Sequence, residues 1–506
     1  MRPPDRRASE NFPFPESDDP GTTCDSEEQP VSALFPNDDD RRRCDDFLSS
    51  ALAAAYARVV EGPVTPTLDA SAVREKLLRF DFAAPRPLEQ LISWVIAQME
   101  DGVVHFTHPR YLGLFNPAPA FPAQCADRIA AVFNPQLASA TTSPAAVEIE
   151  RHTIAAVARR AGLEDEAGGH FTTGGTEANY TALLCALTRA CAGFASDGAR
   201  AFAGPPAFYV SRESHLAWLK IAHQAGLGRT AARMIATDGY GRMRPDSLAA
   251  ALERDRVQGA VPVMIVATAG TTAAGAIDPL IACAEIARDA GLWYHVDAAW
   301  GGALIASDQL RHRLTGIERA DSITIDAHKW FAATMGCGMF LTAQASLLPE
   351  VFGVSASFMP PSTRNLDPYT SSVQWSRRFL GLRLFLALAS AGWAGYAAHV
   401  ERAVALAGLL GKALAALGWR IANEPALAVV CAEPPAGSAS TREVVGRVLG
   451  SGRAWVSAAT FEGREVVRAC ITNGKTTRRD IVAIADALQA AACPAHKKHG
   501  LLRLRS

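Results

Sequence analysis

Short apolar runs alternate with longer amphipathic stretches through the middle of the chain. The apolar runs cover residues 207–210, 261–267, 292–296 and 322–325, and helical periodicity marks residues 176–190, 245–254 and 281–290. Continuous apolar runs are typical of parallel strands that are buried on both faces. The alternation therefore predicts an α/β fold, with a mostly parallel sheet and helices on both of its faces.

Two of these runs end in residues with distinctive chemistry. Residues 321–330 are a mainly apolar run that ends in His328-Lys329-Trp330. Residues 293–300 contain a strand pattern that ends at Asp297. A lysine can hold an aldehyde cofactor as an imine, and a buried carboxylate can keep a pyridine nitrogen protonated, so the pair suits pyridoxal phosphate. Each residue alone has an ordinary interpretation: a lysine after a strand is usually solvated, and an aspartate is often a helix cap.

A third segment suits a phosphate group. Residues 168–179 are rich in glycine and threonine and lead directly into the helical pattern of residues 180–187. Backbone amides at such a helix start bind anions, and glycine lets a phosphate approach the main chain. An ordinary helix start capped by Thr176 is the alternative, and a Walker loop is excluded because no Gly-Lys-Ser/Thr follows. The run at residues 260–272 also ends in a Gly/Thr loop, where doubly wound sheets bind ligands.

Several of these motifs together resemble one family, the group II pyridoxal-phosphate amino-acid decarboxylases, which act on aromatic amino acids, glutamate and diaminobutyrate. The resemblance runs from about Thr107 to the end of the chain. It rests on Ser143-Pro144 with Glu148-Ile149-Glu150, Gly174-Gly175-Thr176-Glu177-Ala178, Gly270-Thr271-Thr272, His295-Val296-Asp297-Ala298-Ala299 and His328-Lys329-Trp330. It implies fold type I, like aspartate aminotransferase, and a homodimer whose active site uses both subunits.

The resemblance also implies roles for individual residues. Lys329 would carry the cofactor, Asp297 would pair with its ring nitrogen, and His215 would stack on its ring. The cofactor-binding set is completed by residues at the phosphate end and beside the ring: Gly175, Thr176, Thr272, Ala299, Asp326 and His328.

The expected reaction is α-decarboxylation of an L-amino acid to the amine and CO2. Tyr369 stands where aromatic-amino-acid decarboxylases carry a loop tyrosine that protonates the substrate carbon, whereas aldehyde synthases tend to have phenylalanine. Arg468, on a C-terminal strand pattern, is expected near the substrate as a positioning residue, because a guanidinium suits a carboxylate. Tyr111 and Phe115 suit an apolar substrate pocket, although core packing alone could explain them.

The substrate signals conflict. Ala138 stands where the aromatic enzymes tend to have phenylalanine, and residues 297–302 look like the glutamate and cysteine-sulfinate branch. An aromatic substrate is favoured, with an acidic or diamino acid, or an aldehyde synthase reaction, as the alternative. An aminotransferase is disfavoured by Tyr369 and the His-Lys-Trp context. A non-catalytic regulator is disfavoured because the chain offers no basic DNA-binding segment.

The length of 506 residues is too great for one compact core. We expect a disordered acidic tail (1–44), an N-terminal helical segment (45–110), a large pyridoxal-phosphate domain with a mobile catalytic loop near its end (111–375), and a small C-terminal α+β domain (376–506).

Charge and composition narrow the possible partners. The formal net charge of −1 offers no electrostatic footprint for nucleic acid. The cysteines are scattered without a Cys-x-x-Cys pair, and His105 and His108 lack a third ligand, so no metal is expected. No apolar run has membrane-spanning length and the N-terminus lacks a signal pattern, which favours a cytoplasmic protein.

Overall fold

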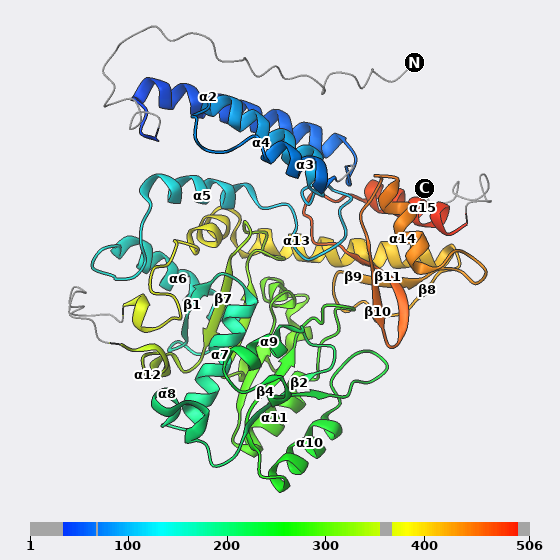
Figure 1. The fold of residues 1–506 in the computed structure, drawn as a ribbon. Helices are drawn as coiled ribbons and strands as arrows, with labels where there is room; N and C mark the ends of the chain where they lie inside the picture. The colour runs from blue at the N-terminus through cyan, green and yellow to red at the C-terminus, as the bar shows by residue number, and fades with distance from the viewer. Residues whose placement is uncertain (1–33, 67–68, 355–366, 494–506) are drawn as a thin grey trace.

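A seven-stranded sheet forms the centre of the large domain in the computed structural model, which describes residues 34–66, 69–354 and 367–493 (Figure 1). Its strand order is β1-β7-β6-β5-β4-β2-β3. The five strands from β6 to β3 run parallel, whereas β7 and β1 run antiparallel to their neighbours. The strands are β1 (Gly168–Thr172), β2 (Pro206–Ser211), β3 (Ala232–Ile235), β4 (Val261–Thr268), β5 (Trp293–Asp297), β6 (Ser322–Asp326) and β7 (Gly338–Thr342).

The apolar runs predicted as strands are confirmed as β2, β4, β5 and β6, within one or two residues at each end. All residues of β5 and β6 are buried, as expected for strands covered on both faces. The sequence interpretation missed β1, β3 and β7. The overall prediction of a mostly parallel α/β sheet is correct.

Helices cover both faces of this sheet. Side chains of β4 alternate between two cores: Met264 and Val266 pack with α7 (Gly175–Ala190), α9 (Ala217–Gln224) and α12 (Leu348–Phe352). Ile265 and Ala267 point to the opposite face. The core on that face includes residues of α6 (Pro144–Ala161), α10 (Pro245–Val257), α11 (Leu280–Ala290) and α13 (Leu382–Ala416). The large domain also contains α5 (Phe121–Phe133) and the short α8 (Phe194–Asp197).

A four-stranded antiparallel sheet, in the order β10-β11-β9-β8, forms the small C-terminal domain. The strands are β8 (Arg420–Ile421), β9 (Val429–Glu433), β10 (Ser457–Phe461) and β11 (Arg464–Cys470), with helices α14 (Thr441–Gly450) and α15 (Arg478–Ala492). The long helix α13 contacts α5 of the large domain and α15 of the small one, and it kinks at Gly392, where φ is 63°. It therefore links the two domains.

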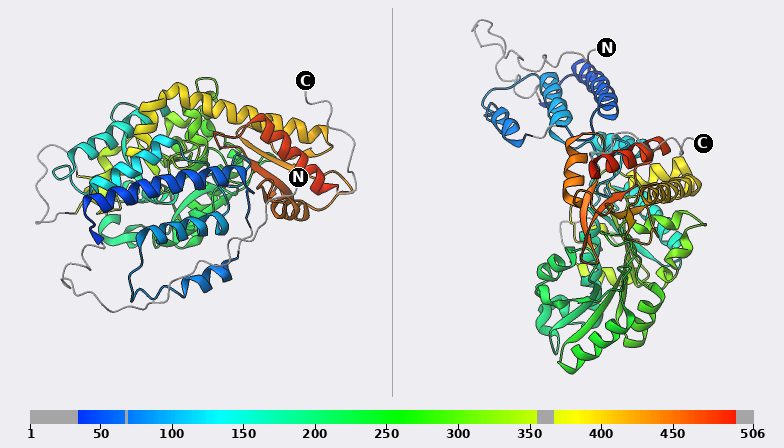
Figure 2. Two further views of the ribbon diagram at one scale, coloured as in Figure 1. Left: turned by 90° about the horizontal axis from the view of Figure 1, so that it is seen from above. Right: turned by 90° about the vertical axis from the view of Figure 1, so that its right-hand side faces the viewer.

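Three N-terminal helices lie together on top of the large domain: α2 (Asp38–Glu61), α3 (Ala70–Leu77) and α4 (Leu88–Gly102) (Figures 1 and 2). The disordered tail predicted to reach residue 44 is too long, because α2 begins at Asp38. Asn37 caps this helix by accepting a hydrogen bond from Asp40 N at 2.9 Å, and three aspartates fill the first turn, where the helix dipole favours negative charge. Residues 1–33 lie outside the described part of the chain.

Within the described ranges, no helix combines the length and the apolar character needed to cross a bilayer.

Candidate active site

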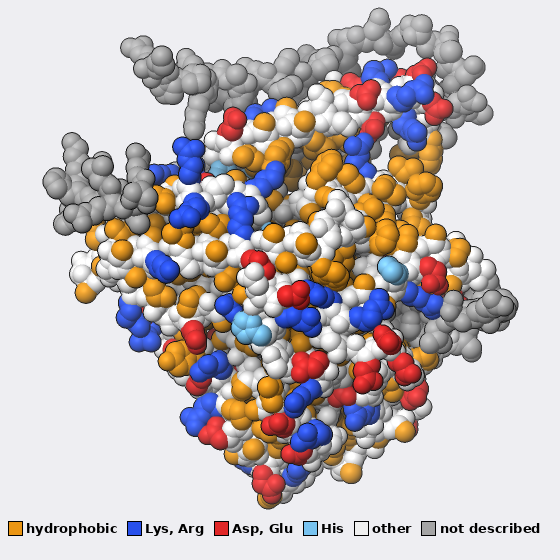
Figure 3. Space-filling model, turned by 180° about the vertical axis from the view of Figure 1, so that it is seen from behind, with side chains coloured by type: hydrophobic (Ala, Val, Ile, Leu, Met, Phe, Trp, Pro, Cys, Tyr) orange, Lys and Arg blue, Asp and Glu red, His pale blue; other side chains and the backbone are white. Residues whose placement is uncertain are grey.

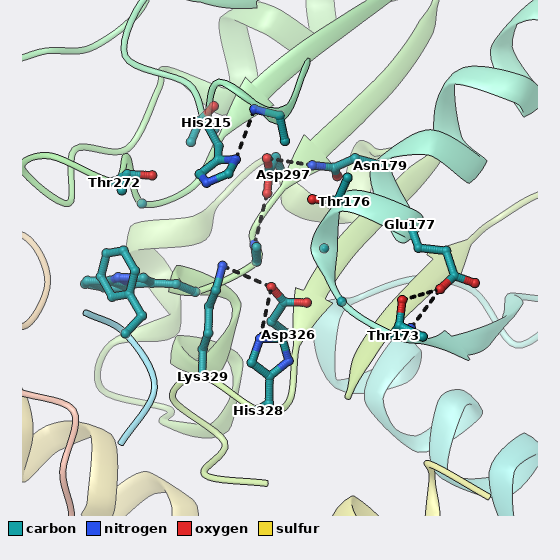
Figure 4. Close-up of a pocket in the computed structure, with 18 of the residues that line it drawn as sticks. Thr173, Thr176, Glu177, Asn179, His215, Thr272, Asp297, Asp326, His328 and Lys329 are labelled. Carbon is teal, nitrogen blue, oxygen red and sulfur yellow. Dashed lines mark hydrogen bonds and ion pairs between the residues drawn. The ribbon is translucent and has the colours of Figure 1, made fainter. Parts of the chain in front are cut away.

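A cavity of about 320 Å³ opens at the carboxyl ends of the parallel strands, beside the start of α7 (Figure 4). Strand β5 ends at Asp297 and β6 ends at Asp326, and both carboxylates line the cavity. Loops at this edge of an open α/β sheet are where ligands bind. The chain therefore places its strand-end polar residues around one space.

Lys329 enters the cavity from the turn that follows β6. Its Nζ atom lies 3.0 Å from Asp326 Oδ2, and its side chain is 23% exposed. The turn is fixed by the backbone, because Lys329 N donates to Asp326 O at 3.1 Å and His328 N donates to Cys337 O at 3.0 Å. The amine is thus reachable from the cavity but attached to a rigid turn.

A chain of hydrogen bonds holds Asp297. Asn179, on α7, donates from Nδ2 to Asp297 Oδ2 at 2.9 Å, and its Oδ1 lies 3.0 Å from His295 Nε2. Because an amide oxygen only accepts, His295 donates from Nε2, and its Nδ1 accepts from Ser322 Oγ at 2.8 Å. Ala299 N also donates to Asp297 Oδ1 at 3.2 Å. The carboxylate is therefore oriented from two sides.

His295, the histidine in this network of hydrogen bonds, is neutral at pH 7. Complete burial lowers the pKa of His295 to about 4, although the nearby Asp297 carboxylate acts in the opposite direction. Asp297 is therefore bonded by neutral donors, and its charge is left for a cation that enters the cavity. A protonated pyridine nitrogen is such a cation.

His215 lines the cavity from the loop between β2 and α9 (Figure 4). Its Nδ1 accepts a hydrogen bond from Ala217 N at 3.2 Å. Burial is the main cause that lowers the pKa of His215, while Asp297 acts to raise it. A neutral, oriented imidazole ring at this position can lie against a planar ligand.

The first turn of α7 forms one end of the cavity and is suited to an anion. Gly174 and Gly175 open the helix, and Thr176 lines the cavity as its second residue. Thr176 does not cap the helix, because the cap residue is Gly174. A Cβ atom on Gly175 would lie 2.9 Å from Asp326 Oδ2, so the close approach of β6 requires glycine there. This explains the second glycine of the sequence motif.

Arg468 connects three segments behind the cavity. It lies on β11, donating from Nε to Thr272 O at 2.9 Å and from Nη1 to Gly113 O at 2.6 Å. Its guanidinium stacks on the Phe115 ring, 4.6 Å from the centroid. Phe115 in turn meets the Trp300 ring edge-on at 4.6 Å, and both aromatic side chains line the cavity.

Every residue predicted to bind the cofactor lines this cavity: Gly175, Thr176, His215, Thr272, Asp297, Ala299, Asp326, His328 and Lys329. Of the predicted substrate residues, Phe115 lines it, whereas Tyr111 and Arg468 do not. Tyr111 is buried against Trp455 at 5.2 Å and accepts a bond from Leu114 N. In the single chain, Tyr111 is therefore a core-packing residue, which is the alternative to a role in the substrate pocket.

Tyr369 also lies away from this lining in the single chain. Its ring packs on Trp375 at 4.7 Å, and its backbone N donates to Ala138 O at 3.2 Å. The predicted mobile loop covers residues 364–379, of which 364–366 lie outside the described residues.

Sequence reasoning gave no role to Asn179 or Trp300. Asn179 belongs to the glycine-threonine motif, one helical turn after Gly175, and is a buried polar residue on an otherwise apolar helix face. That buried amide in an apolar pattern is the signal that could have identified it.

The residues fit pyridoxal phosphate. Asp297 would pair with the ring nitrogen, Lys329 would bind the aldehyde, and the glycine turn of α7 with Thr176 would hold the phosphate. The fit is supported by the neutral donors around Asp297, which leave its charge without an ion pair among the described residues, and by the reachable amine of Lys329. Such an arrangement defines an enzyme that uses an aldehyde cofactor as an electron sink.

Comparison with known proteins gives the family. The model of the pyridoxal-dependent decarboxylase conserved domain matches residues 77–433. The chain belongs to this family and is a pyridoxal-phosphate-dependent amino-acid decarboxylase.

Relatives within the family act on different substrates. The chain is 30% identical to the acidic amino acid decarboxylase GADL1 of Mus musculus, over 72% of this chain and 69% of that protein. It is 28% identical to the aromatic-L-amino-acid decarboxylase of Bacillus atrophaeus, over 85% and 91% respectively. The structure of Oryza sativa TDC with PLP and tryptamine superposes with a TM-score of 0.86 at 24% identity, covering 91% of this chain and 99% of that one, and shares its fold.

Proposed function

We propose that the chain decarboxylates an aromatic L-amino acid to the corresponding amine and CO2. The observation that carries this choice is the composition of the cavity wall. Phe115 and Trp300 form an aromatic corner, and Lys329 is the one lysine or arginine among the described lining residues. An aromatic side chain gains edge-to-face contacts from such a wall, whereas a second carboxylate would lack a cation there.

The chain's own residues have separate tasks in this proposal. Pyridoxal phosphate, when bound, accepts the electron pair left on the α-carbon as CO2 departs. Asp297 would keep the ring nitrogen charged, and Lys329 would hold the cofactor through its aldehyde group. His215 would lie against one face of the ring.

Arg468 acts as a positioning residue. Its bonds to Thr272 O and Gly113 O hold the cofactor loop against the segment that carries Phe115. A tight ion pair with the departing carboxylate would stabilise the ground state more than the transition state, so we do not assign Arg468 that role.

An acidic substrate is the second candidate, and one observation favours it. Arg468 Nη2 is buried and has no hydrogen-bond partner among the described residues. A substrate with a distal carboxylate that passed Phe115 would satisfy this donor.

The proposed active enzyme is a homodimer. In the single chain, α2 buries only Ala55 and α4 only Gln98, while Leu52, Val95 and Met99 are 51%, 46% and 53% exposed. The helices project from the large domain, and hydrophobic side chains gather on and below them (Figures 2 and 3). A second copy that covers this surface would explain three helices with so few buried residues.

Dimer formation would also give Tyr369 a role in the reaction. We propose that the two hydrogen-bonded segments that carry Tyr369 and Ala138 complete the partner's cavity, where the tyrosine hydroxyl would protonate the substrate carbon. Light scattering should give twice the mass of one chain, and replacing Val95 and Met99 with aspartate should give monomers with little activity.

The test of the substrate is a screen. Purified protein is incubated with the twenty amino acids, cysteine sulfinate, diaminobutyrate and dihydroxyphenylalanine, and CO2 and amine are measured for each. Activity on tryptophan, tyrosine or dihydroxyphenylalanine is expected, and activity confined to acidic or diamino substrates would refute the proposal. Lys329→Ala should lose all activity and all borohydride-trapped cofactor.

The role of Tyr369 has its own test. In the presence of dissolved O2, Tyr369→Phe should shift the products from amine and CO2 towards aldehyde, CO2, ammonia and hydrogen peroxide, because a substrate carbon that is not protonated can pass its electrons to O2. Unchanged amine output from this variant would exclude Tyr369 from the reaction.

A further inference from the structure

The carboxylate of Asp326 lies at the end of the cavity where we expect the phosphate of the cofactor. Asp326 closes β6, is 3% exposed, and places Oδ2 3.0 Å from Lys329 Nζ and 3.9 Å from His328 Nε2. Its Oδ1 is buried and has no hydrogen-bond partner among the described residues. An acceptor left without a donor in a buried position is costly, and therefore calls for an explanation.

The carboxylate also lies against the positive end of α7. A Cβ atom on Gly175, the first residue of that helix, would be 2.9 Å from Asp326 Oδ2, and one on Gly338 would be 2.7 Å from Oδ1. Figure 4 shows Asp326 between Lys329 and the start of the helix. The helix dipole and the ammonium group are the two features that stabilise its charge.

Glu177, another carboxylate at this helix start, has a different environment. It accepts hydrogen bonds from Thr173 N at 2.9 Å, from Thr173 Oγ1 at 2.6 Å and from Gln374 Nε2 at 2.8 Å. Its side chain is turned towards Thr173 and away from Lys329 (Figure 4). Glu177 is thus satisfied within the protein, whereas Asp326 shares the helix end with the expected phosphate.

A phosphate dianion and an ionised carboxylate repel each other strongly in a buried site, and neither can donate a hydrogen bond to the other. We propose that Asp326 is a resident anion at the phosphate end of the cavity. It pairs with Lys329 and the start of α7 while the cofactor is absent, and it weakens the hold on the cofactor's phosphate once the cofactor is bound. The enzyme would therefore exchange its cofactor more readily than one with a neutral residue here. This inference rests on the cofactor assignment and is independent of the substrate.

The test separates the phosphate from the rest of the cofactor. Cofactor-free wild type and Asp326→Asn are titrated with pyridoxal phosphate and with pyridoxal, which lacks the phosphate, and binding is followed by tryptophan fluorescence and cofactor absorbance. Asparagine has the same shape without the charge. We expect it to tighten pyridoxal phosphate binding by about tenfold or more, and to change pyridoxal binding by less than about threefold.

Two further variants make the result decisive. Asp326→Ala removes the charge without adding an amide donor and fits the same tight space, so it should also raise the preference for pyridoxal phosphate over pyridoxal. Asp321→Asn, just before the start of the same strand, should leave that preference unchanged while matching the chemical change. Melting temperatures verify that each variant is folded.

The outcomes are distinct. A raised preference in both Asp326 variants supports the resident anion. A raised preference in Asp326→Asn alone would assign the effect to the new amide donor and overturn the proposal, as would equal changes for both ligands or no change. Failure of wild type to bind pyridoxal phosphate at all would instead reject the cofactor site itself.

Discussion

Asn179 Nδ2 donates a hydrogen bond to Asp297 Oδ2 at 2.9 Å, so helix α7 fixes the carboxylate that ends β5. The same helix provides the glycine turn at the proposed phosphate end of the cavity. In the proposed cofactor site, this one helix would position the phosphate through its first turn and the ring nitrogen through a side chain one turn further on.

Asn179→Leu should weaken the enzyme without unfolding it. The substitution leaves Asp297 Oδ2 and the N–H of His295 without their buried partner, which costs about 1–3 kcal/mol for each unsatisfied group. Without this hydrogen bond the Asp297 carboxylate is less well oriented towards the ring nitrogen. We therefore expect roughly 10- to 100-fold weaker cofactor binding and a similar fall in kcat/KM. Thr181→Val, which removes a buried hydroxyl from the same helix, is the matched control and should change neither by more than about threefold. Normal cofactor affinity in Asn179→Leu would contradict this account of Asp297.

The strands and the positions of the key residues could be predicted because they depend on local patterns. Buried parallel strands are continuous apolar runs, and the carboxyl ends of neighbouring strands meet at one edge of the sheet. Lys329 and Asp297 follow such runs directly. Their convergence on one cavity therefore follows from their order in the sequence.

The antiparallel edge of the sheet could not be predicted in the same way. Strand β1 begins with Gly168 and Gly169 and looks like part of a loop, yet it pairs along its whole length with β7. A Cβ atom on Gly169, whose φ is +140°, would lie 1.9 Å from Phe340 O, so the glycine is required by a distant strand. The bond between Asn179 and Asp297 similarly depends on how α7 packs on β5, which no local pattern contains.

Acid should destabilise the protein through its buried histidines. The pKa of His295 falls from 6.5 to about 4 because the ring is completely buried. The unfolded chain then binds more protons than the folded one between these values, so stability is full above pH 6.5 and falls as the pH drops towards 4. His295 alone should cost roughly 3 kcal/mol of unfolding free energy across this window. Urea unfolding at pH 7.5, 6 and 4.5 measures the loss, and His295→Gln should lose less than wild type between the same pH values.

His170 offers a substitution that should stabilise the protein. The ring lies on β1, completely buried, and neither nitrogen has a hydrogen-bond partner among the described residues. Burial, followed by the charge of Arg377, lowers the pKa of His170 to about 3. His170→Leu removes two unsatisfied polar atoms, so we expect about 1 kcal/mol of added stability at pH 7 and a larger gain at pH 5. Urea midpoints at both pH values test this, and lower stability at pH 5 would contradict it.

The strongest destabilisation from a single ion pair should come from Arg377. Its Nη1 lies 2.9 Å from Glu150 Oε2, both side chains are 4% exposed, and Nη1 also donates to Phe171 O at 3.1 Å. The pair joins α6 to the segment before α13, and burial raises the pKa of Glu150 although Arg377 acts to lower it. Arg377→Met leaves a buried carboxylate unpaired, which should cost about 3–5 kcal/mol of unfolding free energy. The neighbouring Arg378 is exposed, so Arg378→Met is the matched control and should change stability by less than about 0.5 kcal/mol. Adding Glu150→Gln to Arg377→Met should restore part of the loss, because the second substitution removes the unpaired charge. A double variant no more stable than Arg377→Met would show that the arginine acts mainly through its contact with Phe171 and not through Glu150.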